Sequence, residues 1–296
     1  MSLVSVIIPT YKSDRTLECA IDSVLNQNYS YIEVIIVDDN DPNTIYRNNT
    51  EDIMLKYKND NRVMYIKHSH NQNGAAARNT GFKNSSGKYI SFLDDDDIFL
   101  QNKVALQVEN LEKHSNFDAV YCGRYKNDKI ISYTKIGNLS KEILLLKYTP
   151  CTPSLMVRKE CYFELNGFDE TYKRHQDFEF LLRFFKKFSI GVVDKPLIRL
   201  GTNGVDNMLH GKKLRQLKMK FLRDFDSYID EIDKDEKSFK QTVYAVHYFE
   251  LIRDHILHHY YILAIKDFLI GLYKSRLKLY AYLWKYIIKI KGKGVK

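Results

Sequence analysis

The 296-residue sequence lacks the marks of several common protein classes. Its four cysteines form no C-x-x-C pair, so they predict reduced, mostly buried thiols of a cytoplasmic protein and not a disulfide or zinc framework. No run of about 18 uncharged apolar residues is present, and residues 3–9 are too short for a secretory leader. We therefore expect neither a transmembrane helix nor export.

Two glycine-rich nucleotide-binding loops are also missing. No G-x-G-x-x-G follows the first apolar run, and no G-x-x-x-x-G-K-[ST] occurs in the chain. These absences argue against NAD-dependent dehydrogenases and P-loop NTPases.

The C-terminal end lacks acidic residues, because residues 274–296 contain eight Lys and Arg and no Asp or Glu.

The net charge of +9 is unevenly distributed, because residues 1–200 hold 27 basic and 26 acidic side chains while residues 201–296 hold 19 and 11. This contrast suggests different roles for the two parts of the chain. Residues 190–196 are typical of a last strand and residues 197–204 of a linker, so we expect a domain over residues 1–204 and a helical, basic region over residues 205–296. Aromatic residues interleave with the terminal cations, which favours a peripheral site on an anionic membrane. The alternative is a packing subdomain or oligomer contact with a solvated basic face. Nucleic-acid binding is not expected, since no nucleic-acid-binding fold is recognisable in the basic region.

Apolar runs that end in polar residues dominate the first hundred positions. Residues 3–8, 33–37, 62–67 and 89–93 are each typical of a buried strand, and helical segments separate them. Such alternation predicts an α/β fold with a largely parallel sheet, whose ligands bind beyond the carboxyl ends of the strands. The segment Pro9-Thr10-Tyr11, the segment 38–40 and the acids that follow residue 93 belong to that edge.

Four consecutive acids, residues 94–97, follow the last of these strands. Carboxylates repel one another unless a cation neutralises them, and oxygen ligands suit Mg²⁺ or Mn²⁺. A solvated acidic turn is the alternative. Residues 71–81 are rich in small side chains and predict a helix whose N-terminus, with Arg78, is suited to a diphosphate. A well-packed, alanine-rich helix with a surface arginine is the alternative.

Together these segments resemble glycosyltransferase family 2, whose members have the GT-A fold and invert configuration at the transferred sugar. The matching segments are Val4-Ser-Val-Ile-Ile-Pro-Thr-Tyr11, Val37-Asp-Asp-Asn40, Asn71-(x)6-Arg78-Asn-Thr-Gly81, Phe92-Leu-Asp-Asp-Asp-Asp97 and Gly167-Phe-Asp-Glu170. They occur in the family's order. The resemblance covers about residues 1–200, is closest to bacterial enzymes of capsule, exopolysaccharide or cell-wall synthesis, and fades afterwards.

The resemblance implies a role for each matching position. A UDP-sugar donor and a metal, Mn²⁺ or Mg²⁺, are expected, with Asp39 accepting the uracil N3–H and Asp96 ligating the metal. Asp94 is expected to hold sugar or ribose hydroxyls, and the role of Asp95 stays open because four acids leave the register uncertain by one. The other implied donor-site residues are Pro9, Thr10, Tyr11, Asn71 and Arg78.

Asp177 matches the acid of the family's catalytic segment and is implied to be the general base that deprotonates the acceptor. Its place at a predicted helix start would favour the ionised form through the macrodipole; an ordinary helix-stabilising acid is the alternative. Gln176 stands where relatives often have Glu. The Gln-x-x-Arg-Trp motif of processive synthases is absent, which favours transfer of one sugar at a time.

His210 stands where some family members supply a metal-ligating histidine; a plain loop position is the alternative. The implied function is an inverting, metal-dependent transferase that forms a β-linkage to a saccharide or lipid-linked oligosaccharide at the inner face of the cell membrane. Two alternatives stay open: a catalytically silent nucleotide-sugar-binding scaffold subunit, and a nucleotidyltransferase, which would carry a glycine-rich basic loop after the first strand. A homo-oligomer is also compatible with the sequence.

Overall fold

The computed structural model describes residues 1–13, 16–127, 129–201 and 209–291, with side chains as far as residue 284. The chain divides into two compact units, Met1–Ser140 with Thr149–Val205, and Lys141–Tyr148 with Asp206–Lys296. The predicted boundary after residue 204 lies outside the described residues. Residues 141–148 group with the second unit, although the sequence pattern places them in the first domain.

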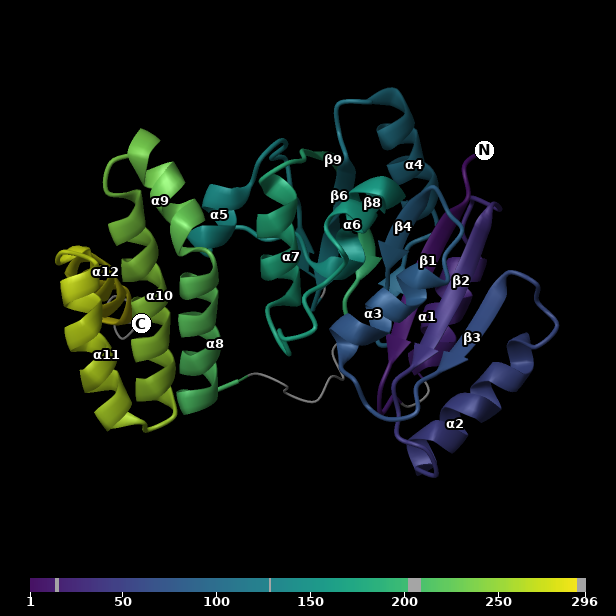
Figure 1. The fold of residues 1–296 in the computed structure, drawn as a ribbon, viewed down its shortest axis with the longest axis horizontal. Helices are drawn as coiled ribbons and strands as arrows, with labels where there is room; N and C mark the ends of the chain where they lie inside the picture. Colours follow the sequence, from purple (N-terminus) through teal and green to yellow (C-terminus); the bar gives the residue numbers. More distant parts are fainter. Residues whose placement is uncertain (14–15, 128, 202–208, 292–296) are drawn as a thin grey trace. The chain divides into compact units, whose positions relative to one another are not determined.

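The first unit is built on one sheet whose first half is parallel (Figure 1). Its parallel strands, in spatial order, are β3 (Val63–Lys67), β2 (Ile32–Asp38), β1 (Val4–Thr10) and β4 (Tyr89–Phe92). All four coincide with predicted strands, and β1 and β2 are almost wholly buried. Their carboxyl ends lie at one edge because they run in the same direction.

The second half of the sheet is mixed, and it continues from β4 through β8 (Met156–Arg158), β6 (Ala119–Lys126), β9 (Ile190–Arg199) and β5 (Ile98–Phe99), with β7 (Lys129–Ile131) paired to β6. The sequence predicts that the last strand stops at Pro196 and that a linker follows. That prediction was wrong, because Ile198 pairs with Phe99 and both side chains are buried.

Helices cover both faces of this sheet, as the apolar strands predict. They are α1 (Thr16–Leu25), α2 (Ile45–Met54), α3 (Gly74–Lys83), α4 (Lys103–Lys113), α6 (Lys159–Glu164) and α7 (Gln176–Phe185), with 3-10 turns at Leu55–Tyr57 and Thr152–Ser154. Val6 and Ile8 of β1 share a core with α1, while Ile7 points to the opposite face and meets α3. A Cβ on Gly81 would lie 2.4 Å from Ile7 Cγ2, so only glycine lets α3 approach β1 this closely.

A buried lysine lies directly behind the strand that carries the acids. The Nζ of Lys103 donates to Ser91 Oγ at 3.0 Å and to Gln107 Oε1 at 2.8 Å, and it lies 3.8 Å from the centroid of the Phe99 ring. Burial lowers the pKa of Lys103 to about 8, because the ammonium has lost its hydration. Its hydrogen bond to Ser91 holds α4 against β4, whereas Gln107 lies one turn further along α4 itself.

The second unit is helical, as expected. Its helices are α5 (Ser140–Leu144), which straddles the division, α8 (Gly211–Asp224), α9 (Asp226–Asp235), α10 (Phe239–Leu257), α11 (Tyr261–Lys274) and α12 (Lys278–Lys291). Its core forms where Ala245, Tyr248, Leu251 and Ile252 of α10 meet Leu279 of α12. No helix in the described part of the chain is both long and apolar enough to cross a membrane.

Candidate active site

Three predicted site segments meet at the carboxyl edge of the parallel strands. Thr10 pairs in register with Asp38, so the loop after β1 lies beside the turn after β2. β4 runs along the other side of β1 and ends at Phe92, which pairs with Ile7. The topology thus brings residues 9–11, 38–40 and 93–97 to one edge, as the sequence predicts.

Asp95 joins the acidic cluster to the first loop. Its Oδ2 accepts from the Thr10 hydroxyl at 2.7 Å and from the Tyr11 N–H at 3.3 Å. Burial raises the pKa of Asp95 to about 6, although the hydrogen bond from Thr10 lowers it. Asp95 therefore positions the loop that is expected to hold the nucleotide. Pro9 lies within β1 opposite Val37, and Tyr11 is exposed at the loop.

Arg78 connects the acidic cluster to the start of α7. Its Nη2 donates to Asp94 Oδ1, and its Nη1 donates to Gln176 Oε1 at 2.8 Å. The guanidinium carbon lies 5.7 Å from the centroid of the Phe168 ring. One side chain of α3 thus holds together two segments that are more than 80 residues apart, and the planar fork of arginine suits this double contact.

Asp177 follows Gln176 in the first turn of α7, where the sequence places it. It is half-buried, and its Oδ1 accepts from the Phe178 N–H at 3.0 Å. Burial raises the pKa of Asp177 to about 6; the positive charge of Arg78 opposes this rise and the negative charge of Asp94 adds to it. Desolvation therefore outweighs the ionising effect expected from the helix start. A carboxyl with this pKa can take a proton near neutral pH.

Asp96 and Asp97 complete the acidic cluster. Asp97 accepts from the Gly201 N–H at 2.8 Å, and burial raises its pKa to about 8, with repulsion from Asp94 as the next cause. Burial also raises the pKa of Asp96. Within the described residues, no other residue donates a hydrogen bond to the Asp96 side chain. The cluster thus gathers four neighbouring acids, of which Asp94 is the one that Arg78 contacts in the described residues, and such oxygen ligands fit a divalent metal.

Asp39, the predicted uracil contact, is 2% exposed and already well supplied with donors. Its Oδ1 lies 2.7 Å from His68 Nδ1 and accepts from the Gln72 N–H, while its Oδ2 accepts from the Asn71 side chain and the Asn73 N–H. Asp39 therefore fixes the loop before α3, and its contact with uracil stays a prediction. Asn71 acts on the same carboxylate, which brings two predicted residues together.

Sequence reasoning missed two of these partners. His68 is buried between Asp39 and the Thr80 hydroxyl, which lies 2.9 Å from its Nε2. For Gln176 the sequence shows only a substitution of the family's Glu, although this side chain accepts from Arg78. Both contacts join segments that are distant in sequence, and no local sequence pattern predicts a partner for either residue.

His210, the second predicted metal ligand, belongs to the helical unit, whereas Asp96 belongs to the first. It lies just before α8, and its Nδ1 is 2.7 Å from Asp254 Oδ1. Its part in a metal site with Asp96 stays a prediction.

Known proteins resemble this chain in sequence. The family model described as glycosyl transferase family 2 matches residues 5–186. An uncharacterized glycosyltransferase of Rickettsia prowazekii is 33% identical over 208 residues, which cover 67% of this chain and 63% of that protein. The Escherichia coli UDP-Glc:alpha-D-GlcNAc-diphosphoundecaprenol beta-1,3-glucosyltransferase WfaP is 33% identical over 162 residues, which cover 50% of this chain and 62% of that protein. The chain thus spans less than two thirds of the length of these two relatives.

Solved structures share the fold. The crystal structure of S. aureus TarS 1-349 in complex with UDP-GlcNAc gives a TM-score of 0.63 at 16% identity, covering 96% of this chain and 92% of that chain. The mannosyltransferase PcManGT from Pyrobaculum calidifontis, in complex with GDP-Man and Mn²⁺, gives a TM-score of 0.61 at 16% identity. The match covers 97% of this chain and 86% of that chain. These likenesses confirm the expected GT-A fold. The family match over residues 5–186 shows that this chain belongs to glycosyltransferase family 2.

Proposed function

We propose that this chain transfers a single sugar from a UDP-sugar to a saccharide acceptor and inverts the configuration at the transferred carbon. The observation that carries the proposal is the bridge made by Arg78, which contacts Asp94 of the acidic cluster and Gln176 beside Asp177. It brings the carboxylates expected to serve the donor close to the carboxylate expected to serve the acceptor.

The donor end of the site is assigned to the loop after β1 and to the acidic cluster. Thr10 and Tyr11, held by Asp95, border the nucleotide, and Arg78 supplies positive charge for the diphosphate. Asp96, with Asp94 beside it, would hold Mn²⁺ or Mg²⁺. Such a cation neutralises the charge that develops on the departing UDP. PcManGT, a protein of the same fold, forms a complex with Mn²⁺, which supports a divalent cation here.

Asp177 is assigned the proton transfer. Its ionised carboxylate takes the proton of the acceptor hydroxyl as that oxygen attacks the anomeric carbon. The new carbon–oxygen bond forms on the face opposite UDP, the bond to UDP breaks, and its electron pair leaves with the diphosphate. An α-linked donor therefore gives a β-linked product. At neutral pH most of the Asp177 population is ionised, since its pKa is about 6.

The acceptor is proposed to be a lipid-linked sugar. The WfaP relative acts, by its name, on GlcNAc-diphosphoundecaprenol, which is a membrane lipid. The helical unit offers a surface for such a membrane. Along α11 the side chains of Ile262, Ile265, Leu269 and Tyr273 form an exposed apolar stripe, and Ile262 is 85% exposed.

Cations accompany this apolar stripe. Lys266, Lys274 and Arg276 are exposed on or after α11, and no acid follows Asp267 in the sequence. Beyond them, Tyr280 and Trp284 are also exposed and stack at 6.4 Å between ring centroids. Apolar, aromatic and basic side chains on two consecutive helices, α11 and α12, suit the interface of an anionic membrane. We therefore place the chain peripherally at a membrane surface.

A transfer assay tests the proposal. The chain is incubated with Mn²⁺, UDP-glucose or UDP-GlcNAc, and an analogue of GlcNAc-diphosphoundecaprenol, and the anomeric configuration of the product is read by NMR. A β-linked product is expected. An α-linked product would exclude inversion, and UDP binding without transfer from any UDP-sugar would favour the silent binding subunit.

A further inference from the structure

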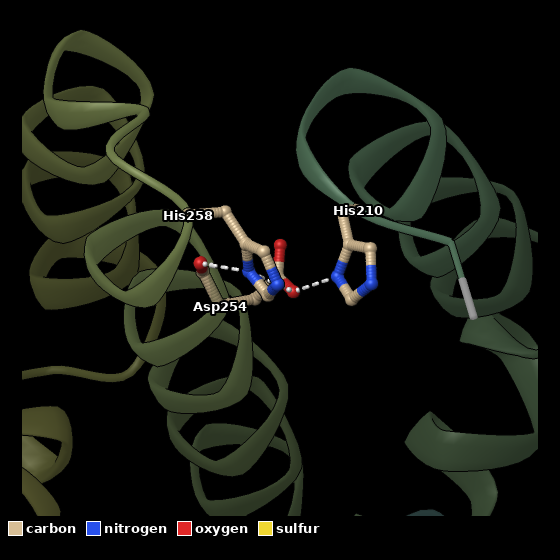
Figure 2. A group of neighbouring side chains, drawn as sticks. All are labelled: His210, Asp254 and His258. Carbon is tan, nitrogen blue, oxygen red and sulfur yellow. Dashed lines mark hydrogen bonds and ion pairs between the residues drawn. The ribbon is translucent and has the colours of Figure 1, made fainter. Parts of the chain in front are cut away.

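Three potential metal ligands converge inside the helical unit. His210 precedes α8, while Asp254 and His258 lie one helical turn apart at the end of α10. Their ligand atoms all lie within 4.8 Å of one another. Figure 2 shows the three side chains pointing toward each other from the two helices.

The spacing within this cluster resembles that of a metal shell. The Nδ1 atoms of His210 and His258 lie 2.7 and 3.2 Å from the same Asp254 oxygen, Oδ1. In a tetrahedral zinc site, bonds of roughly 2.0–2.1 Å place neighbouring ligand atoms about 3.3 Å apart. His258 Nδ1 also lies 2.9 Å from the backbone carbonyl oxygen of Asp254, so a shared metal ion would replace this hydrogen bond.

The surroundings hold the carboxylate in place and leave one polar atom without a partner. Asp254 Oδ2 accepts from the Gly211 N–H at 3.0 Å. The fully buried His255 presents its Nδ1 3.6 Å from that oxygen, and this nitrogen makes no hydrogen bond. Its other ring nitrogen lies 3.1 Å from Asp267, which pairs with Arg215. A buried, unpartnered nitrogen beside the cluster is an observation independent of the three-residue geometry.

We propose that His210, Asp254 and His258 bind a divalent transition metal of the Zn²⁺ class. Imidazole nitrogens with one carboxylate suit zinc, whereas the carboxylate oxygens of Asp96 suit Mg²⁺ or Mn²⁺. The site clamps the start of α8 to the end of α10. It gives His210 a role within its own unit in place of the predicted one with Asp96, and it does not depend on the proposed sugar transfer.

Three protein ligands leave one position for an external oxygen ligand. His210 also lines a cavity of about 910 Å³ whose wall includes Lys212, Lys213 and Tyr260. The fourth ligand is therefore a water or an anionic oxygen admitted from this cavity, where the two lysines provide positive charge.

Metal analysis of the full chain tests the site. After removal of metals with a chelator, Zn²⁺ binding is measured by calorimetry with elemental analysis, and Co²⁺ is used as a spectroscopic probe. We expect one tightly bound Zn²⁺ per chain and the visible absorption of tetrahedral Co²⁺. His258→Ala and, separately, His210→Ala should weaken Zn²⁺ binding on the order of tenfold or more and remove that absorption.

Two controls isolate the cluster. His259 is exposed, adjacent to His258 and outside the ligand set, and its φ of 62° makes His259→Asn the matched substitution. This variant and Asp96→Ala should both keep the Zn²⁺ site. Wild-type protein that binds no Zn²⁺, or equal Zn²⁺ affinity and Co²⁺ absorption in wild type and both histidine variants, would overturn the proposal.

Discussion

Replacing Asp177 by asparagine should remove most transfer activity and leave UDP binding nearly unchanged. The substitution keeps the size of the side chain and its contact with the Phe178 N–H, but it removes the group that accepts the proton. General-base catalysis contributes about 10²–10⁴-fold, so kcat should fall by that factor. The donor site keeps Arg78 and Asp96, which explains why the Kd for UDP should stay within about threefold.

The pKa of Asp177 sets how strongly the activity of the wild-type chain should depend on pH. With a pKa of about 6, about nine tenths of the Asp177 carboxyls are ionised at pH 7 and about one tenth at pH 5. Because the ionised form is the base, kcat/KM should rise with pH and level off above about pH 7. Between about pH 5 and the plateau the expected gain is about tenfold.

The assay follows UDP release at saturating UDP-sugar with varied acceptor over this pH range, which gives both kcat and kcat/KM, and UDP binding is measured by calorimetry. Glu160→Gln is the matched control, since Glu160 is an exposed acid in the first turn of α6 in the same unit. It should leave both rate and pH profile unchanged. A rate for Asp177→Asn within threefold of wild type, or a wild-type profile that is flat between about pH 5 and pH 7, would refute the assignment of the base.

Three further predictions follow from named contacts. In wild type the positive charge of Arg78 lowers the pKa of Asp177, so in Arg78→Gln the acidic limb of the kcat/KM profile should move to higher pH. An unmoved limb would contradict this electrostatic effect of Arg78 on Asp177. Lys103 binds its proton less tightly when folded, with a pKa of about 8 against the usual 10.5, so stability rises with pH above 8. In urea melts from about pH 7 to about pH 9.5 the wild type should gain about 2 kcal/mol relative to Lys103→Met, and a constant difference would refute this. Ile262→Ser combined with Leu269→Ser should weaken binding to anionic vesicles by about 3 kcal/mol, or roughly hundredfold, and unchanged cosedimentation would exclude the α11 face.

The carboxyl edge of the sheet was predictable because its signals are local. Each parallel strand is a short apolar run, and each run ends at the polar residues of the site, as with Phe92 and the acids after it. Parallel strands bring such ends together without further information. The position of Asp177 in the first turn of α7 was equally local, since Phe178, Leu181 and Leu182 show helical spacing.

The contacts that organise the site were not predictable, because they join distant segments. Arg78 and Gln176 are separated by 98 residues, and no local pattern pairs them. The same holds for His68, which meets Asp39 across 29 residues. The strand β9 was cut short in the prediction because Asp194, Lys195 and Pro196 interrupt its apolar run, while burial against β5 continues it. Tertiary packing overrode the local pattern there.

The most direct test of the central claim, a metal-dependent UDP-sugar site at the acidic cluster, is calorimetric titration with UDP in the presence of Mn²⁺ and again with EDTA. We predict binding with Mn²⁺ that weakens by at least about tenfold with EDTA and in Asp96→Ala. Equal binding with Mn²⁺ and EDTA would contradict the metal assignment, and no binding of UDP by the folded chain would contradict the donor site itself.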